Sequence, residues 1–180
     1  MSGEWKRQVP APSSRLISTM DVGAPIDIRE MTEGDLDEVL EIERVTFPSP
    51  WSRALFEREL VTPFARSFVG LRKESGQISG YLCFWLVEQE GHVLNLAVHP
   101  QHRGQRIGTR LLGFGVEFCR KQGVQLITLE VRRSNYKAIS LYRNFQFQSQ
   151  GIRRRYYADS GEDAIIMGLN LGDGKSLSTA

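Results

Sequence analysis

The sequence predicts a single α/β domain built on one mixed β-sheet. A length of 180 residues suits one domain, and 41% hydrophobic with 24% charged residues is the balance of a globular protein. The hydrophobic pattern changes along the chain between alternation, typical of strands, and repeats of three and four residues, typical of helices. A meander followed by strand, loop, helix, strand, helix and strand indicates a mixed sheet of about seven strands flanked by four helices.

The first half of the chain is expected to form a strand, two helices and a meander. Thr32 and Asp35 are spaced to begin the first helix, which ends near Val45. Ser52 can cap a second, short helix. The strands of this half are expected over residues 26–31, 65–71, 78–90 and 92–98.

The second half is expected to alternate helices and strands. Ile107, Leu111, Phe114 and Phe118 recur at intervals of 4, 3 and 4, which places them on one face of a helix. This helix is predicted over residues 105–121. The elements that follow are a strand over 124–131, a helix over 135–145, and strands over 147–157 and 164–171.

Both ends of the chain are expected to lie outside the fold. Residues 1–25 contain three prolines and no hydrophobic period, which predicts a disordered tail, and residues 172–180 predict a flexible one. Because the folded pattern begins only at residue 26, translation could begin at Met1 or at Met20. No segment has the ~20 apolar residues of a membrane span, so we expect no membrane partner.

Charge and cysteine content exclude several classes of protein. The net charge of +2, from 23 basic and 21 acidic side chains, is too balanced for a protein that mainly coats nucleic acid. Cys83 and Cys119 each lie inside an apolar run, so both are expected to be buried and reduced in a cytoplasmic protein. The three histidines lack the spacing of a metal site, and we expect no metal.

The charges are distributed unevenly. Residues 30–43 hold seven acids and no base, whereas residues 132–155 hold seven bases and no acid. One interpretation is two solvated faces, with acids favoured near a helix N-terminus. The other is that the acidic helix attracts a basic peptide and that the basic stretch serves phosphate groups or nearby RNA.

Residues 96–112 have the pattern of a phosphate-binding loop. They run from a strand through a tight loop into a helix, which directs unpaired backbone N–H groups and the positive helix end at one point. Gly104 and Gly108 allow a ligand to approach that backbone closely. The pattern is compatible with binding of a pyrophosphate, and also with an ordinary glycine-containing turn.

Glu130, Asn135 and Tyr142 form a second group of candidate residues. Glu130 lies near the end of the strand over 124–131, on the face opposite Ile127 and its alternate neighbours. Asn135 and Tyr142 are seven residues apart, on one face of the next helix. From spacing alone, Glu130 is either a general base or an ion-paired carboxylate, and Tyr142 is either a general acid or a core aromatic.

Residues 96–112 resemble the acetyl-CoA motif of the GCN5-related N-acetyltransferases, Arg/Gln-x-x-Gly-x-Gly/Ala after a strand ending in Ala-Val-x-Pro. Arg103 and Gly108 fill the outer positions, and Arg106 stands at the middle glycine. An arginine suits that position only if the backbone there needs neither a positive φ nor an absent side chain. The resemblance implies a bent sheet and acetyl-CoA as cosubstrate. It implies cofactor contacts from the backbone of a bulged strand at Leu96, Ala97 and Val98, and from Arg103, Gly104, Gln105, Arg106, Ile107, Gly108, Thr109 and Asn135.

Further segments resemble the ribosomal-protein-alanine N-acetyltransferase (RimI) branch of this family. Leu-Glu-Val-Arg-x-Ser-Asn from residue 129, followed by Ala-Ile-x-Leu-Tyr, is similar to that branch. Residues 47–52 resemble its Phe-Pro-Trp-Ser loop with two residues inserted, and 152–157 and 162–167 resemble its last two strands. The resemblance covers residues 26–171 and identifies them as an N-acetyltransferase domain. It implies Glu130 as general base, Tyr142 as general acid, and substrate contacts from Trp51, Ser52, Tyr156 and Tyr157.

The reaction implied is direct acetylation of the N-terminal alanine of a small-subunit ribosomal protein. An α-amine has a pKa near 7.7–8.0 and must lose a proton before it attacks a thioester, which is the task of Glu130. Two alternatives remain open: acetylation of another amine (a lysine, a polyamine or an aminoglycoside) and a non-catalytic CoA-binding module. The ribosomal protein N-terminus is the expected partner, and contact with ribosomal RNA would be incidental. The sequence leaves the oligomeric state open, and a monomer is the simplest expectation.

Overall fold

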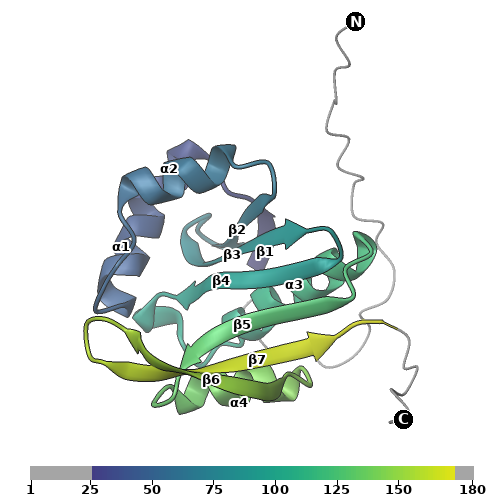
Figure 1. Ribbon diagram of the computed structural model, residues 1–180. Helices are drawn as coiled ribbons and strands as arrows, with labels where there is room; N and C mark the ends of the chain where they lie inside the picture. The colour runs from purple at the N-terminus through teal and green to yellow at the C-terminus, as the bar shows by residue number, and fades with distance from the viewer. Residues whose placement is uncertain (1–25, 173–180) are drawn as a thin grey trace, which may run out of the picture.

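The computed structural model describes residues 26–172; the expected N-terminal tail, the choice between Met1 and Met20, and residues 173–180 lie outside this range. Seven strands form one sheet in the order β1-β2-β3-β4-β5-β7-β6 (Figure 1). No described helix has the length and apolar character needed to cross a membrane. The elements in chain order are β1 (Ile26–Glu30), η1 (Glu33–Asp35), α1 (Leu36–Thr46), α2 (Arg53–Val61), β2 (Ala65–Arg72), β3 (Ile78–Val87), β4 (Glu90–Val98), η2 (Pro100–His102), α3 (Ile107–Lys121), β5 (Leu126–Arg132), α4 (Tyr136–Asn144), β6 (Gln148–Tyr157) and β7 (Glu162–Asn170).

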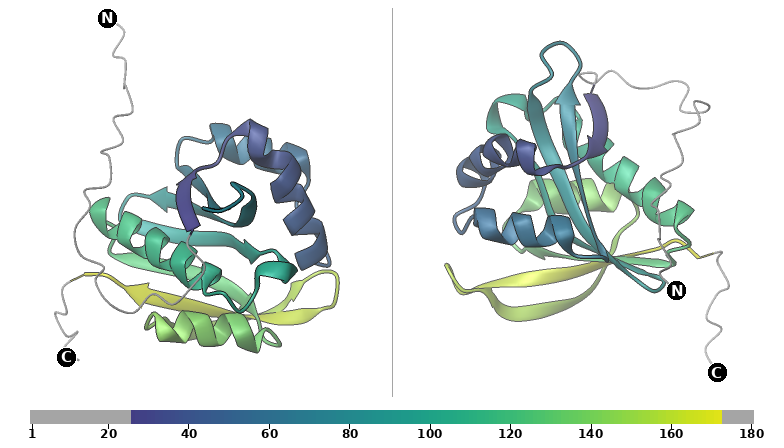
Figure 2. Two further views of the ribbon diagram at one scale, coloured as in Figure 1. Left: turned by 180° about the vertical axis from the view of Figure 1, so that it is seen from behind. Right: turned by 90° about the horizontal axis from the view of Figure 1, so that it is seen from above.

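The sheet separates two layers of helices (Figure 2). Side chains alternate along β2 and β3, so that Phe68 and Leu82 join a core cluster with α3 and α4. Val69 and Tyr81 point to the opposite face, where they join a second cluster with α1 and α2. The apolar alternation of the sequence therefore serves two cores, one on each face of the sheet.

β4 and β5 form the one parallel pair among the strands described, and they stay together only at their beginnings. Their pairing runs from Glu90 with Leu126 to Val93 with Leu129. Leu94 is then an extra residue in β4, because the register against β3 shifts at this point. Beyond the bulge the two strands diverge (Figure 1). The carboxyl ends of β4 and β5 are thus not paired with each other, and we call this interruption of the sheet the gap; a ligand in such a sheet usually lies at such a place.

The predicted mixed sheet of seven strands and four helices is confirmed, with small errors at the boundaries. α3 begins at Ile107 and not at Gln105, because Arg106 adopts a left-handed conformation that ends the helix on its N-terminal side. The strand predicted over 78–90 ends at Val87. Glu88, with φ of 52°, turns the chain into β4.

Candidate active site

The pleat of β4 decides which backbone groups face the gap. The His99 N–H bonds to the Ser79 carbonyl of β3 at 2.9 Å, so by alternation the Ala97 groups also face β3. A Cβ placed on Gly80 would lie 2.6 Å from the Ala97 carbonyl oxygen, which agrees with this direction. The backbone N–H and C=O groups of Ala97 therefore pair with β3 and do not face the gap. Of the three residues predicted to contact the cofactor here, Leu96 and Val98 direct their backbone groups toward the gap.

The loop between β4 and α3 leads into the N-terminus of α3, which the side chain of its N-cap residue Arg106 does not cap. Gly104 has φ of 79°, and a Cβ there would meet no atom within 4 Å, so this position is glycine for conformational reasons. No side chain caps the first turn of α3, which leaves its N–H groups for an anion. Arg103, Arg106 and Thr109 are exposed around this turn. These groups fit the diphosphate of acetyl-CoA.

The backbone at Arg106 does not meet the condition under which an arginine would suit this position, which was that no positive φ is needed there. Its φ is 59° and its ψ is 14°, in the left-handed region. The position therefore does need a positive φ, which explains why glycine suits it and places strain on arginine. Ile107, the next predicted cofactor residue, is 1% exposed and its side chain belongs to the core. Only its backbone can meet a ligand.

Glu130 projects from β5 on the face of the sheet opposite α3 and α4. Its side chain is 8% exposed. Glu130 Oε2 lies 2.8 Å from His92 Nε2, and Oε1 lies 3.1 Å from an Arg153 guanidinium nitrogen. His92 Nδ1 is in turn 2.8 Å from the Thr128 hydroxyl. The carboxylate is thus held by two neighbours and is ion-paired, as the second interpretation of the sequence allowed.

Tyr142 lies on the other side of the gap, within the core cluster of α3 and α4. Burial, and to a smaller extent the Tyr157 phenol, raises the pKa of Tyr142 above its ordinary value. Burial also raises the pKa of Tyr157 to about 12, and the Glu130 charge contributes to this rise. Both phenols therefore keep their protons near neutral pH.

Asn135 precedes α4 as its N-cap and does not lie within the helix. Its side-chain oxygen accepts a hydrogen bond from the Ala138 N–H at 3.2 Å. Asparagine is among the preferred N-cap residues, so the sequence contained this information. Only the amide nitrogen of Asn135 is left for a cofactor.

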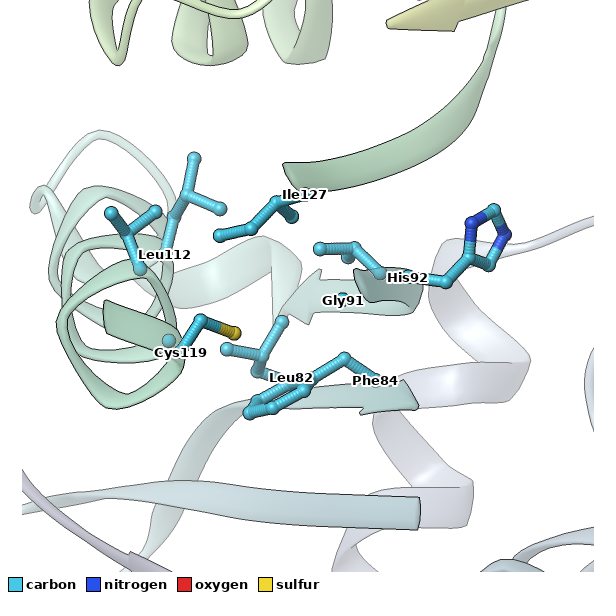
Figure 3. Close-up of a pocket in the computed structure, with 10 residues that line it drawn as sticks. Leu82, Phe84, Gly91, His92, Leu112, Cys119 and Ile127 are labelled. Atoms are coloured by element: carbon cyan, nitrogen blue, oxygen red, sulfur yellow. The ribbon is translucent and has the colours of Figure 1, made fainter. Parts of the chain in front are cut away.

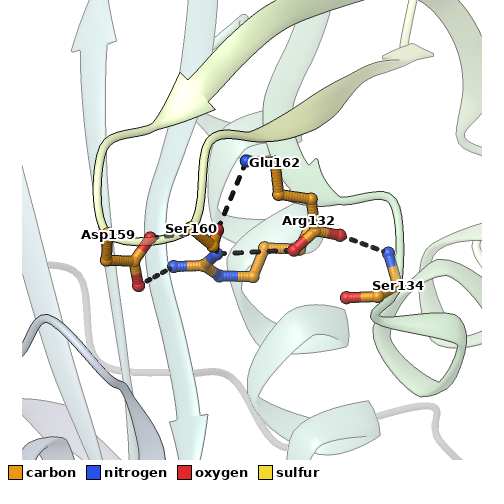
Figure 4. Close-up of polar contacts among 5 residues, drawn as sticks. All are labelled: Arg132, Ser134, Asp159, Ser160 and Glu162. Carbon is orange, nitrogen blue, oxygen red and sulfur yellow. Dashed lines mark hydrogen bonds and ion pairs between the residues drawn. The ribbon is translucent and has the colours of Figure 1, made fainter.

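Arg132, the last residue of β5, binds side chains of the β6–β7 hairpin just before the loop that leads to α4 (Figure 4). Its guanidinium lies 2.6 Å from Asp159 and 3.4 Å from Glu162, and it stacks 3.9 Å from the centre of the Tyr157 ring. Glu162 also accepts a hydrogen bond from the Ser134 N–H at 2.7 Å. This network positions Tyr157 and the hairpin beside the gap.

Residues 47–52 lie between α1 and α2 and include Trp51 and Ser52, which are predicted to contact the substrate; on that prediction we call this segment the acceptor loop. The Trp51 ring packs 5.3 Å from that of Phe56, and Ser52 Oγ accepts the Leu55 N–H at 3.3 Å as the cap of α2. Ser52 therefore has a structural role. Tyr156, on the hairpin, is 45% exposed, and the centre of its ring lies 5.1 Å from that of Tyr157.

The acids of residues 30–43 do not form a uniform solvated face. Glu43 is fully buried, and Asp35 is 7% exposed. Both oxygens of Asp35 lie 2.7 Å from the Arg29 guanidinium, whose hydrogen bonds lower the pKa of that carboxyl to about 2. On the basic side, Arg153 and Arg154 pair with carboxylates.

The two free cysteines are buried, as predicted. Cys119 borders a small apolar cavity of about 10 Å³ between α3 and the sheet. Figure 3 shows the His92 ring pointing away from this cavity. Burial raises the pKa of both Cys83 and Cys119 to about 12. Neither thiol is suited to form an acyl intermediate, because both stay protonated.

Comparison with known proteins decides the family. Residues 36–147 match the model of the acetyltransferase (GNAT) family. The chain belongs to the GNAT family. As a GNAT protein it is an N-acetyltransferase, and enzymes of this family use acetyl-CoA.

Relatives of this GNAT chain cover nearly the whole described domain. It is 39% identical over 147 residues to a Bacillus subtilis protein provisionally named [ribosomal protein bS18]-alanine N-acetyltransferase, across 81% of this chain and 96% of the relative. It is 38% identical over 155 residues to the N-alpha-acetyltransferase RimI of Mycobacterium tuberculosis, across 83% and 95%. The crystal structure of the ribosomal-protein-S18-alanine N-acetyltransferase from Escherichia coli is similar with a TM-score of 0.76 and 32% identity, across 86% of this chain and 100% of that one.

The sequence analysis did not predict two residues of the candidate site, His92 and Arg153, as partners of Glu130. His92 was considered only as a metal ligand, and Arg153 only as part of a basic stretch. The pairing of His92 with Thr128 depends on the register of two strands separated by α3. A parallel register is set by how the connecting helix packs, so the sequence gives no local indication of it.

Proposed function

We propose that this N-acetyltransferase transfers the acetyl group of acetyl-CoA to the N-terminal alanine of ribosomal protein bS18. The placement of Glu130 carries the proposal: a nearly buried, fixed carboxylate stands where β4 and β5 diverge. The names of the relatives supply the acceptor. The reaction is proposed to take place in the cytoplasm, where the two cysteines stay reduced.

Glu130 is proposed as the general base. Acetyl-CoA supplies an activated thioester, held by the N–H groups at the start of α3 and by the backbone of β4. A carboxylate oxygen of Glu130 takes a proton from the α-ammonium group, directly or through a water molecule. His92 Nε2 at 2.8 Å and Arg153 at 3.1 Å fix the orientation of this carboxylate.

The remaining steps are assigned to β4 and Tyr142. A backbone N–H of Leu96 or Val98, directed into the gap, stabilises the oxyanion that forms on the acetyl carbonyl. Tyr142 donates its phenolic proton to the departing CoA sulfur, and the tyrosinate regains a proton through solvent from the nitrogen, which loses its second proton as it becomes an amide. Glu130 lies on the face of β5 opposite the core cluster that contains Tyr142, so the base and the acid come from opposite faces of the sheet.

Two other functions are the alternatives to this proposal. A lysine, polyamine or aminoglycoside amine would need the same base and acid, and only the acceptor side would differ. A non-catalytic CoA-binding module would need neither Glu130 nor Tyr142. The buried, oriented Glu130 favours catalysis over simple binding.

Mass spectrometry of two peptides tests the proposal. One peptide begins with free Ala-Arg, and the other has a blocked N-terminus and an internal lysine. Each is incubated with the full chain and acetyl-CoA. Acetylation of the first peptide alone is expected. Acetylation of the second alone would overturn the acceptor, and binding of CoA without transfer to either would favour another amine or the binding module.

A further inference from the structure

A carboxylate with no exposed surface lies beneath the acceptor loop. Glu43 projects from the inner face of α1 and is 0% exposed. Its Oε1 accepts the Trp51 backbone N–H at 2.8 Å, and the Asn95 side-chain nitrogen lies 3.2 Å from Oε2. The Tyr81 hydroxyl also donates to Oε2. These donors are all uncharged, so Glu43 is held by hydrogen bonds from neutral groups.

The three donors come from three separate parts of the candidate site. Trp51 belongs to the acceptor loop and Tyr81 to β3. Asn95 directly follows Leu94, the bulge at which β4 leaves β5. β4 then continues to Leu96 and Val98, whose backbone groups face the gap. Glu43 therefore connects the loop on the acceptor side to the strand on the acyl side.

The ionised carboxylate accepts from all three donors, and the Asn95 nitrogen lies 3.2 Å from Oε2 and 3.4 Å from Oε1. Its two oxygens offer about four acceptor positions. Protonation, or replacement by glutamine, turns one of these oxygens into a donor. The Tyr81 hydroxyl can rotate and accept, but the Asn95 NH₂ and the Trp51 N–H can only donate. A neutral group at position 43 therefore leaves Asn95 or Trp51 with a weakened bond.

Glu43 is also the member of this cluster that titrates near neutral pH. Burial raises its pKa to about 7, opposed by the hydrogen bonds from the acceptor loop and from β4. The other titratable groups packed nearby are Tyr81 and Cys83 on β3 and Glu59 on α2, and the charges of Glu43 and Glu59 both act on the Cys83 thiol. Burial raises the pKa of Cys83 to about 12, so this thiol does not titrate in the same range.

We propose that the ionised Glu43 carboxylate is a positioning residue that fixes the acceptor loop against the bulged strand. The proposal rests on the proposed function, because it assigns residues 47–52 to acceptor binding. Loss of the charge should weaken binding of the acceptor peptide and leave acetyl-CoA binding unchanged. We expect the acceptor KM to rise about tenfold, the size expected for one hydrogen bond to a charged group.

The test compares the wild type with Glu43→Gln and with a matched control, Glu59→Gln. Glu59 is also buried, at 4% exposure, but its polar partners are elsewhere: it accepts the Trp85 indole N–H at 2.6 Å and pairs with Arg58 at 3.9 Å. The acceptor KM is measured at saturating acetyl-CoA from pH 6 to 8.5. Deprotonation of the α-amine affects every variant equally, so it cancels in the ratio of variant to wild type.

The ratio for Glu43→Gln should be about ten at pH 8.5 and approach one at pH 6, where the wild-type carboxyl is itself protonated. The ratio for Glu59→Gln should not change with pH. A Glu43→Gln ratio that stays constant with pH, or an equal loss of acetyl-CoA affinity, would overturn the proposal.

Hydrogen exchange of the Trp51 amide gives a second measurement that needs neither turnover nor a variant. Its protection factor in the free wild-type protein should fall as the pH drops through about 7. A constant protection factor would count against the role of Glu43. Absence of acetyl transfer by the wild type would count against the proposed function alone.

Discussion

Replacing Arg106 by glycine is expected to stabilise the fold, because Arg106 is held at φ 59° and ψ 14°. An L-residue in this region is strained by about 1–2 kcal/mol. Glycine relieves that strain, but its freer unfolded chain costs about 0.5–1 kcal/mol. The net gain should be about 0.5–1 kcal/mol, or an increase in Tm of about 2 °C for a domain of this size.

Arg106→Ala is the matched control for this prediction. Alanine removes the guanidinium as glycine does, but keeps the side-chain strain. The free energy of unfolding, from urea denaturation, should therefore be about 1 kcal/mol higher for Arg106→Gly than for Arg106→Ala. If the two variants are equally stable, or alanine is the more stable, the conformational reasoning is wrong.

The same two variants measure what the arginine contributes to the cofactor. Arg106 is exposed beside the uncapped first turn of α3, where a cation can pair with phosphate. Both variants should weaken acetyl-CoA binding by the same factor, about fivefold to tenfold, in isothermal titration. A loss confined to one variant would show that backbone shape and not charge sets the affinity.

Three further predictions concern packing, pH and the hairpin. Gly80→Ala should destabilise the fold by about 2 kcal/mol in urea denaturation, because its Cβ would lie 2.6 Å from the Ala97 carbonyl oxygen; an unchanged midpoint would contradict this. Because burial raises the pKa of Glu43 to about 7, the folded chain holds a proton that the unfolded chain has released. The free energy of unfolding should therefore fall as pH rises from about 4.5 to 7, by at most ~3 kcal/mol, and Glu43→Gln should flatten that slope. Arg132→Met should increase hydrogen exchange in the β6–β7 hairpin and raise the acceptor KM a few-fold, because it removes both ion pairs and the contact with Tyr157. Unchanged exchange would count against the role of Arg132 in holding the hairpin.

The sequence predicted what depends on local periodicity. Alternation in the strand over 126–132 correctly separated Leu129 from Glu130, because side chains of a strand point to opposite faces. The helical repeat of residues 36–43 also predicts a buried position for Glu43, an inference that was not drawn from the sequence. Glu43 is seven residues after Leu36, so the repeat places it on the buried face, although its charge suggested a solvated one.

The features of the site that were not predicted depend on long-range contacts and backbone angles, which residue types do not specify. His92 meets Glu130 only because β4 and β5 pair in one particular parallel register. Arg153 reaches the same carboxylate from β6, the strand at the far edge of the sheet order, across the fold. The left-handed angle at Arg106 could have been inferred from the glycine that this motif normally carries, which is a property of backbone shape rather than of charge.

The most direct test of the account uses one peptide that begins with alanine and contains an internal lysine. Tandem mass spectrometry locates the acetyl group, and the initial rate is compared between the wild type and Glu130→Gln. We predict acetylation at the α-amine alone, with the variant about 100-fold slower or more and its affinity for acetyl-CoA unchanged. Acetylation of the lysine, or a variant as fast as the wild type, would contradict the central claim that Glu130 activates an N-terminal amine in the gap between β4 and β5.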